Sequence, residues 1–164
     1  MKRERPIALV DTNVWLDNCL GDRPGSRDSR EFLMQALNNK LLLVYPVHCL
    51  RDIFYLVQAH LKVLARKDGA ISDAESLAIR EAAWACVDEV RRMATAVAAD
   101  ESDAWRACKY RAITNDLEDN FVLAAAERAS VDFMVTNDVD LVKKSTVNAY
   151  TPADATRMLE ATWS

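Results

Sequence analysis

The chain has 164 residues, of which 21 are Lys or Arg and 25 are Asp or Glu, so its formal net charge at pH 7 is -4. Hydrophobic residues make up 51% and charged residues 28%, a balance typical of globular proteins and not of disordered or collagen-like chains. An acidic chain lacks the positive field that attracts nucleic acids or anionic membranes, so local groups must attract any phosphate-bearing substrate. The length is that of one domain, and we expect a single domain over residues 1–164.

The cysteines and the apolar stretches indicate an intracellular protein. The four cysteines contain no C-x-x-C pair, which disfavours a zinc site, and we expect them to be buried free thiols: Cys19, Cys49, Cys86 and Cys108. Apolar stretches such as residues 41–47 are too short to cross a bilayer, and the charged start is not followed by a signal-peptide core. We therefore expect a cytoplasmic location without membrane contact.

The first half of the chain is typical of two strands, each followed by helices. A short apolar run of the kind buried in parallel sheets precedes Asp11, and a second run ends at Pro46, which favours the first turn of a long helix. A loop containing Gly21, Pro24 and Gly25 separates two helical segments between these strands. In chain order, the expected elements are a strand at 7–10, helices at 13–20 and 29–39, a strand at 40–46 and a helix at 47–66.

The second half continues the alternation. Ser72 and Glu75 form a capping-box signature that begins a long helix, and the acidic run "NDLEDNF" begins another. In chain order, we expect a helix at 72–92, a strand at 93–99, helices at 102–112 and 115–129, a strand at 132–135, an extended stretch at 147–150 and a helix from 152. Strands separated by helices favour right-handed parallel crossovers. The sequence predicts an α/β fold whose parallel sheet of four to five strands is covered on both faces.

Acidic residues gather at one edge of this sheet. Asp11 follows the first strand directly, and Asp138 follows the strand at 132–135. Asp119 lies in the first turns of a helix that begins at the same edge. In such sheets the ligand crevice lies beyond the carboxyl ends of the strands. These three acids are therefore expected to line one site.

A fourth acid, Asp52, lies in a helix interior among the apolar residues Leu50, Ile53 and Leu56, where aspartate is unfavourable. A carboxylate held among apolar side chains needs a partner or a bound cation. Pairing with His48, one turn earlier, or with a nearby basic residue is the alternative explanation.

Four neighbouring carboxylates require a compensating charge, and Mg²⁺ or Mn²⁺ prefers such oxygen ligands. Such a metal activates water and neutralises a phosphoryl group, so the pattern favours phosphodiester hydrolysis. Each acid also has an explanation without metal. Asp11 can cap the following helix, Asp138 can be a turn residue, and Asn115 with Glu118 can form a capping box.

The motifs resemble those of the PIN-domain ribonucleases, a family that includes toxins of bacterial toxin–antitoxin pairs. "LVDTNVWLD" is similar to the first acidic motif and "HCLRDIFYLVQ" to the second, although many members have glutamate where this chain has Asp52. "DLEDNFVLAAAERASVDFMVTNDVDL" resembles the third and fourth motifs, and "VNAYTPADATRML" resembles the last strand and helix. The helical segment at 69–92 looks like an insert that a subset of members carries.

The resemblance implies a three-layer α/β/α sandwich that cleaves single-stranded RNA with Mg²⁺ or Mn²⁺. The implied catalytic and metal-binding residues are Asp11, Asp52, Asp119 and Asp138. Polar groups beside these acids are expected to orient them: Thr12, Asn13, Asp116, Glu118, Thr136 and Asn137. An antitoxin protein and a homodimeric state are further expectations from the family.

Substrate contacts are expected from residues near the first strand. Trp15 is the aromatic residue closest behind Asp11 and is expected to stack on RNA. Three basic residues of the following loop are expected to contact phosphates, with solvated surface charge as the alternative: Arg23, Arg27 and Arg30.

Two other functions stay open. A haloacid-dehalogenase-like phosphatase also has an aspartate after its first strand, but its site needs a second acid two positions later, where this chain has Asn13. A noncatalytic RNA-binding or protein-interaction module on the same scaffold would gain nothing from a costly acidic cluster near RNA.

Overall fold

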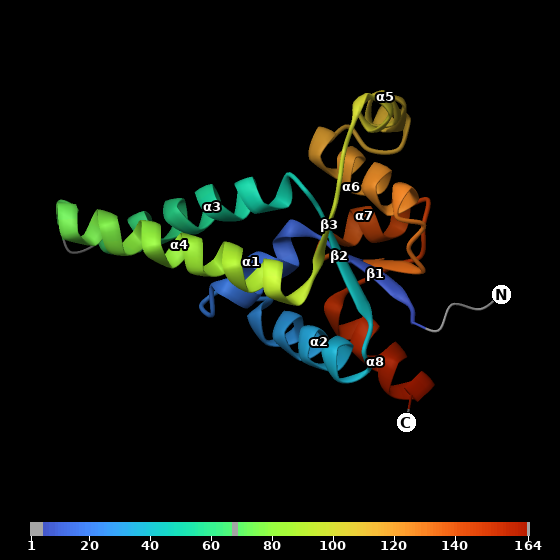
Figure 1. Cartoon of the computed structure of the whole chain (residues 1–164), viewed down its shortest axis with the longest axis horizontal. Helices are drawn as coiled ribbons and strands as arrows, with labels where there is room; N and C mark the ends of the chain where they lie inside the picture. Colours follow the sequence, from blue (N-terminus) through green and yellow to red (C-terminus); the bar gives the residue numbers. More distant parts are fainter. Residues whose placement is uncertain (1–4, 67–68, 164) are drawn as a thin grey trace.

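The computed structural model describes residues 5–66 and 69–163 (Figure 1). In this part of the chain a five-stranded sheet has the order β3-β2-β1-β4-β5, and every neighbouring pair is parallel. The strands are β1 (Ile7–Val10), β2 (Leu42–Pro46), β3 (Thr95–Val97), β4 (Phe133–Val135) and β5 (Ala149–Tyr150). The central strand β1 pairs with β4 in a register that places Val10 opposite Val135. Both strands therefore end at the same level.

Helices connect all successive strands, and one further helix follows the last strand. They are α1 (Thr12–Cys19), α2 (Ser26–Asn38), α3 (Cys49–Ala65), α4 (Asp73–Met93), α5 (Glu101–Lys109), α6 (Leu117–Arg128), α7 (Val139–Lys144) and α8 (Pro152–Trp163), with a 3-10 turn η2 (Tyr110–Ala112). The Ser72 and Glu75 capping box is present at the start of α4, as predicted. The predicted box of Asn115 and Glu118 is wrong, because the side chain of Asp116 caps α6.

Two hydrophobic cores lie on opposite faces of the sheet because successive side chains of a strand point to opposite sides. Ala8 and Val10 of β1 belong to the core that α1, α2, α3, α4 and α8 cover. Leu9 of β1 and Met134 of β4 belong to the core beneath α6 and α7. Burial on both faces explains why β1 and β4 are continuous apolar runs in the sequence. The three-layer α/β/α sandwich is confirmed.

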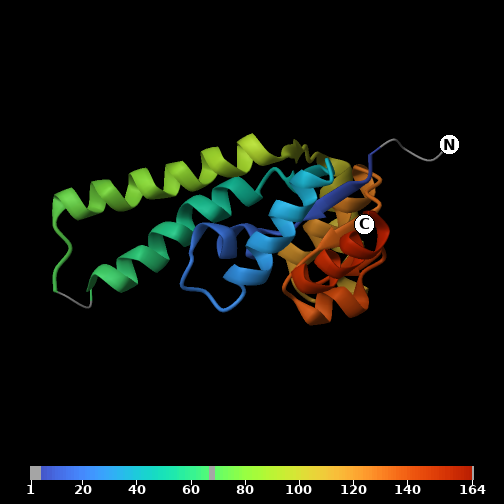
Figure 2. The same ribbon diagram turned by 90° about the horizontal axis from the view of Figure 1, so that it is seen from below.

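The helices α3 and α4 form an antiparallel hairpin that extends away from the sheet (Figures 1 and 2). The rings of Phe54 and Trp84 pack across the hairpin with their centroids 4.8 Å apart. Near its base, Asn18 of α1 donates a hydrogen bond to Glu89 of α4. The predicted insert at 69–92 is therefore the second arm of this hairpin. No helix formed by the described residues is long and apolar enough to span a membrane.

Two features of the local structure differ from what the sequence indicated. The short helix α7 was not predicted, since its six residues are too few to show a helical period; its first turn is capped by Asp138. Burial of all four thiols was also predicted, but only Cys49 is buried, while Cys19 and Cys86 are half-buried and Cys108 is exposed.

Candidate active site

The carboxylate of Asp11 lies at the carboxyl end of β1 and is 5% exposed. Its Oδ1 accepts a hydrogen bond of 2.7 Å from the backbone N–H of Thr12, which caps α1. Its Oδ2 accepts hydrogen bonds from Asn13 Nδ2 at 2.9 Å and from Thr136 Oγ1 at 2.7 Å. Asp11 therefore caps a helix, as the alternative explanation held, and is also fixed to the end of β4.

The pKa of Asp11 shows that negative charge is unfavourable at this position. Burial is the main cause that raises the pKa to about 6, while the hydrogen bonds from Thr136 and Thr12 act in the opposite direction. The charges of Asp119 and Asp138 raise it further. A cation beside these three acids would stabilise the ionised carboxylates.

A polar network holds the ends of β1 and β4 together. The Thr136 hydroxyl accepts hydrogen bonds from Asn13 Nδ2 and from the backbone N–H of Asp138. The backbone N–H of Asn137 donates to Asn13 Oδ1 at 3.0 Å, and the Asn137 amide donates to Asp17 at 2.7 Å. Of the residues expected to orient the acids, Asn13, Thr136 and Asn137 are thus joined by hydrogen bonds.

Asp17 is a residue that sequence reasoning missed. Its buried carboxylate pairs with Arg23 and accepts the Asn137 hydrogen bond. The available signal was an aspartate inside the apolar helical run "VWLDNCL", the same signal that had singled out Asp52. Asp17 links the loop before α2 to the residues that follow β4.

Asp138 follows β4 and begins α7. Its Oδ1 accepts hydrogen bonds from the backbone N–H groups of Asp140 and Leu141. Its Oδ2 receives no hydrogen bond from any residue that the structure describes. One oxygen therefore caps the helix, and the other has no hydrogen-bond donor among the described residues.

The first turn of α6 contributes Asp119 beside Asp11 and Asp138. Burial raises the pKa of Asp119, and the charges of Asp116 and Asp138 add to this effect. A hydrogen bond from Thr114 and the positive charge of Lys144 act in the opposite direction. Lys144, in the last turn of α7, is a second residue that sequence reasoning missed. It brings a positive charge near the acids.

Asp52 lies in the first turn of α3 and forms an ion pair of 2.9 Å with Arg51. Its partner is thus a neighbouring basic residue and not His48. Leu56 is exposed, so Asp52 is less surrounded by apolar side chains than the sequence suggested. Burial raises the pKa of Glu118, and the charges of Asp52 and then Asp11 raise it further. The carboxylate of Glu118 therefore interacts with the charges of both Asp52 and Asp11.

The donor chemistry of the site fits a hard cation. Asp11 has further carboxylates nearby, and the pKa values of Asp11, Glu118 and Asp119 are raised mainly by burial and further by the charges of neighbouring acids. Among residues 5–66 and 69–163, no three His, Cys, Asp or Glu side chains are close enough together to hold a metal ion.

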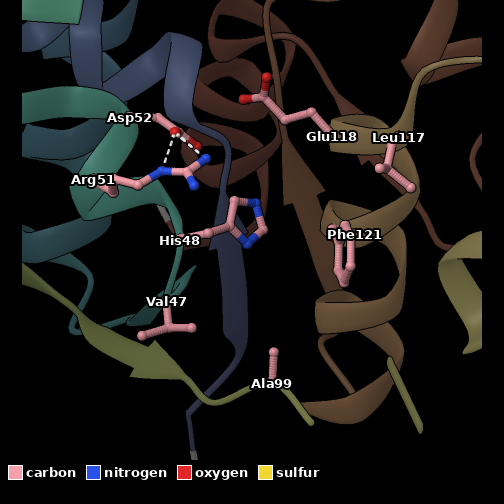
Figure 3. Close-up of a pocket in the computed structure, with 8 residues that line it drawn as sticks. All are labelled: Val47, His48, Arg51, Asp52, Ala99, Leu117, Glu118 and Phe121. Carbon is pink, nitrogen blue, oxygen red and sulfur yellow. Dashed lines mark hydrogen bonds and ion pairs between the residues drawn. The ribbon is translucent and has the colours of Figure 1, made fainter. Parts of the chain in front are cut away.

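A pocket of about 360 Å³ opens beside the acids, between the start of α3 and the first turns of α6 (Figure 3). Asp52 and Glu118 contribute carboxylates to it. Figure 3 shows the His48 ring between the ion pair of Asp52 and the ring of Phe121. The sequence did not predict this pocket, because its walls come from elements that meet only in the folded protein.

The predicted substrate contact of Trp15 is wrong. Its side chain is completely buried, and its Nε1 donates a hydrogen bond of 3.1 Å to the carbonyl oxygen of Val10. Arg23 is engaged by Asp17, and Arg30 donates to the carbonyl oxygen of Asn18. Arg27 and Arg30 are exposed in α2, so contact with a substrate stays a prediction for them.

The fold and the acids at its carboxyl edge define the class of PIN-like α/β/α sandwiches. A family model described as the PIN domain matches residues 8–140, from β1 into α7. The chain therefore belongs to the PIN-domain family, whose members are generally nucleases and typically use divalent metal ions. No curated protein matches the chain.

Proposed function

We propose that this PIN domain is a Mg²⁺- or Mn²⁺-dependent endoribonuclease that hydrolyses phosphodiester bonds of single-stranded RNA. The observation that carries the proposal is the buried carboxylate of Asp11, whose pKa is raised to about 6 and which lies beside two further acids, Asp119 and Asp138. Such a cluster is costly to the fold unless a cation binds there. Membership of a nuclease family supports the same reaction.

Asp11, Asp119 and Asp138 are the proposed metal ligands around the switch point of the sheet. Asp52 is proposed as the fourth ligand, directly or through water, with Glu118 between it and Asp11. When bound, the metal supplies an activated water and neutralises charge on the phosphate. Hydrolysis at these residues would leave a 3′ hydroxyl and a 5′ phosphate.

The chain's own residues prepare the acids for this role. Thr136 and Asn13 hold the Asp11 Oδ2 atom by hydrogen bonds, which fixes the carboxylate and favours its ionised form. The helix caps made by Asp138 and Asp116 fix the start of α7 and α6. Lys144 and the exposed Arg51 are local positive charges that can attract a phosphate toward an otherwise acidic site.

A role as the toxin of a toxin–antitoxin pair is a narrower form of the proposal. Exposed apolar side chains on the α3–α4 hairpin, among them Tyr55, Leu56 and Val63, offer a surface for an antitoxin or for a second copy of the chain. Light scattering of the purified protein, and its isolation together with the product of a neighbouring gene, test these two partners.

Metal titration followed by RNA cleavage tests the proposed function. We expect the wild type to bind Mn²⁺ and to cut a labelled single-stranded RNA, and Asp11→Asn and Asp138→Asn to lose both properties. Asp88→Asn, which changes an exposed acid on α4, is the matched control and should behave as the wild type. If the wild type cuts no RNA in Mg²⁺ or Mn²⁺ and Asp11→Asn leaves metal binding unchanged, the proposal is wrong.

The same preparation separates the alternatives. A noncatalytic module would bind RNA without cutting it. A phosphatase would release phosphate from a small aryl phosphate. That reaction needs a second acid at the position of Asn13, whose side chain instead donates a hydrogen bond to Asp11.

A further inference from the structure

The pocket beside the acids has a chemistry different from that of the acids themselves. Two carboxylates, Asp52 and Glu118, form one part of its lining. The rest is largely apolar or aromatic and includes Val47, Leu117 and Phe121. Its volume of about 360 Å³ is that of a small ligand site. A charged phosphate is a poor occupant for such walls, whereas a flat unsaturated ring is a good one.

Two aromatic rings, those of His48 and Phe121, form part of the pocket wall. The rings of His48 and Phe121 meet edge to face with their centroids 5.8 Å apart and an interplanar angle of 63°. The Nε2 atom of His48 is buried and has no hydrogen-bond partner among the described residues. Leu117 is 59% exposed at the rim, so a ligand that covered it would remove apolar surface from water. Bases of single-stranded RNA stack on such side chains without requiring a particular sequence.

The pocket is continuous with the proposed catalytic acids. Asp52 and Glu118 line the pocket, and the charges of Asp52 and Asp11 both act on Glu118. Arg51, whose side chain is 72% exposed, stands at the same opening and can contact the backbone of a strand that enters. The pocket therefore shares Asp52 and Glu118 with the acidic region.

We propose that this pocket binds one unpaired base of the RNA substrate, next to the phosphate that lies at the acids. The inference rests on the proposed function and deepens it, because a base that is paired and stacked in a duplex cannot enter the pocket. The pocket walls would then select single strands over duplexes, and the acids would carry out hydrolysis.

A binding experiment without metal tests the pocket independently of cleavage. The probes are a labelled oligouridylate and the same ribose-phosphate strand without bases, and fluorescence anisotropy in the presence of a chelator gives both affinities. We expect the wild type to bind the strand with bases about tenfold more tightly. Leu117→Glu, at an exposed position, and Phe121→Leu, which keeps an apolar side chain, should remove this difference. Val63→Ala, an exposed change elsewhere on α3, should retain it.

A cleavage experiment places the base relative to the phosphate. The substrate is a strand in which one phosphodiester alone can be hydrolysed, with a base omitted on one side of that bond or the other. For the wild type, omission of the base on one side should lower kcat/KM by about tenfold. On the complete strand, Leu117→Glu should lower kcat/KM by the same factor. On the strand that lacks the base on that side, Leu117→Glu should cause no further loss.

Each result decides a separate claim. Equal wild-type affinity for strands with and without bases overturns the pocket proposal and leaves an apolar side chain of a protein partner as the better occupant. Equal losses for Leu117→Glu on both cleavage substrates overturn it as well. Failure of the wild type to cut any strand overturns the proposed function, while the metal-free affinities still decide the pocket.

Discussion

The hydroxyl of Thr136 donates a hydrogen bond of 2.7 Å to the carboxylate of Asp11, which lies 125 residues earlier in the chain. The same hydroxyl accepts hydrogen bonds from Asn13 and from the backbone N–H of Asp138. One side chain thus fixes the ends of β1 and β4 and the start of α7. The consequences of this arrangement can be measured.

Replacing Thr136 tests whether it positions Asp11 for metal. Thr136→Val removes the hydroxyl at nearly constant volume, so Asp11 loses a donor that orients its carboxylate and favours ionisation. We expect Mn²⁺ affinity, measured by calorimetry at neutral pH, to fall by about tenfold or more. Thr136→Ser keeps the hydroxyl and should bind nearly as the wild type. Equal weakening by both variants would assign the effect to packing of the methyl group.

The stability of the metal-free protein should depend on pH through Asp11. Its pKa is about 6 in the folded protein against an ordinary value of 3.8, so the folded state binds more protons between these two pH values. Stability therefore falls as pH rises through this window, with a contribution from Asp11 on the order of 3 kcal/mol. Urea unfolding with a chelator at several pH values should show a steeper fall for the wild type than for Asp11→Asn. Asp88→Asn should keep the wild-type slope, and identical slopes for all three proteins would contradict the buried charge.

Asp17 should matter for both stability and activity. Asp17→Asn removes the ion pair with Arg23 and alters the acceptor of the Asn137 amide in a buried setting. We expect the free energy of unfolding to fall by about 2 kcal/mol and RNA cleavage to slow, because Asn137 then loses its fixed orientation. Asp22→Asn is the matched control. Asp22 also pairs with a basic side chain, His60, but it is exposed, and this variant should unfold and cleave as the wild type.

Arg51 should contribute to RNA binding through charge. Its guanidinium is largely exposed and pairs with Asp52, so Arg51→Ala is expected to change stability little. The slope of the logarithm of RNA affinity against the logarithm of salt concentration should decrease in magnitude by about 0.7, the value for one phosphate contact on a single strand. Arg80→Ala, an exposed change on α4, should leave the slope unchanged. A slope unaltered in both variants would place the RNA backbone elsewhere.

The parts of the site that could be predicted from the sequence are those that local patterns determine. Asp11 and Asp138 follow apolar runs, and strands buried on both faces of a parallel sheet end at a common edge. The register of Val10 with Val135 confirms this edge. The helix-start position of Asp119 and the apolar sequence around Asp52 singled out the other two acids, whose roles as ligands stay predictions.

The parts that could not be predicted depend on partners distant in the chain. Trp15 was expected to contact RNA, but α1 packs into the core with neighbouring helices, and the indole N–H donates a hydrogen bond to the carbonyl oxygen of Val10. Asp17 accepts a hydrogen bond from Asn137, a residue after β4 that lies close to Asp17 only in the folded protein. The pocket needs His48 and Phe121 to meet from α3 and α6, which no local period indicates.

The position of β1 in the middle of the sheet has a consequence for synthesis of the protein. Asp11 and Asp52 are made early, but β1 has an open edge until β4 is added, and Thr136 and Asp138 come after that strand. Before β4 has been made, the growing chain lacks the strand that pairs with the second edge of β1. It also lacks Thr136 and Asp138, which lie beside Asp11 in the folded protein. If the acids cut RNA as proposed, a translating ribosome is not exposed to this activity by the chain it is making until β4 and the residues that follow it have been made.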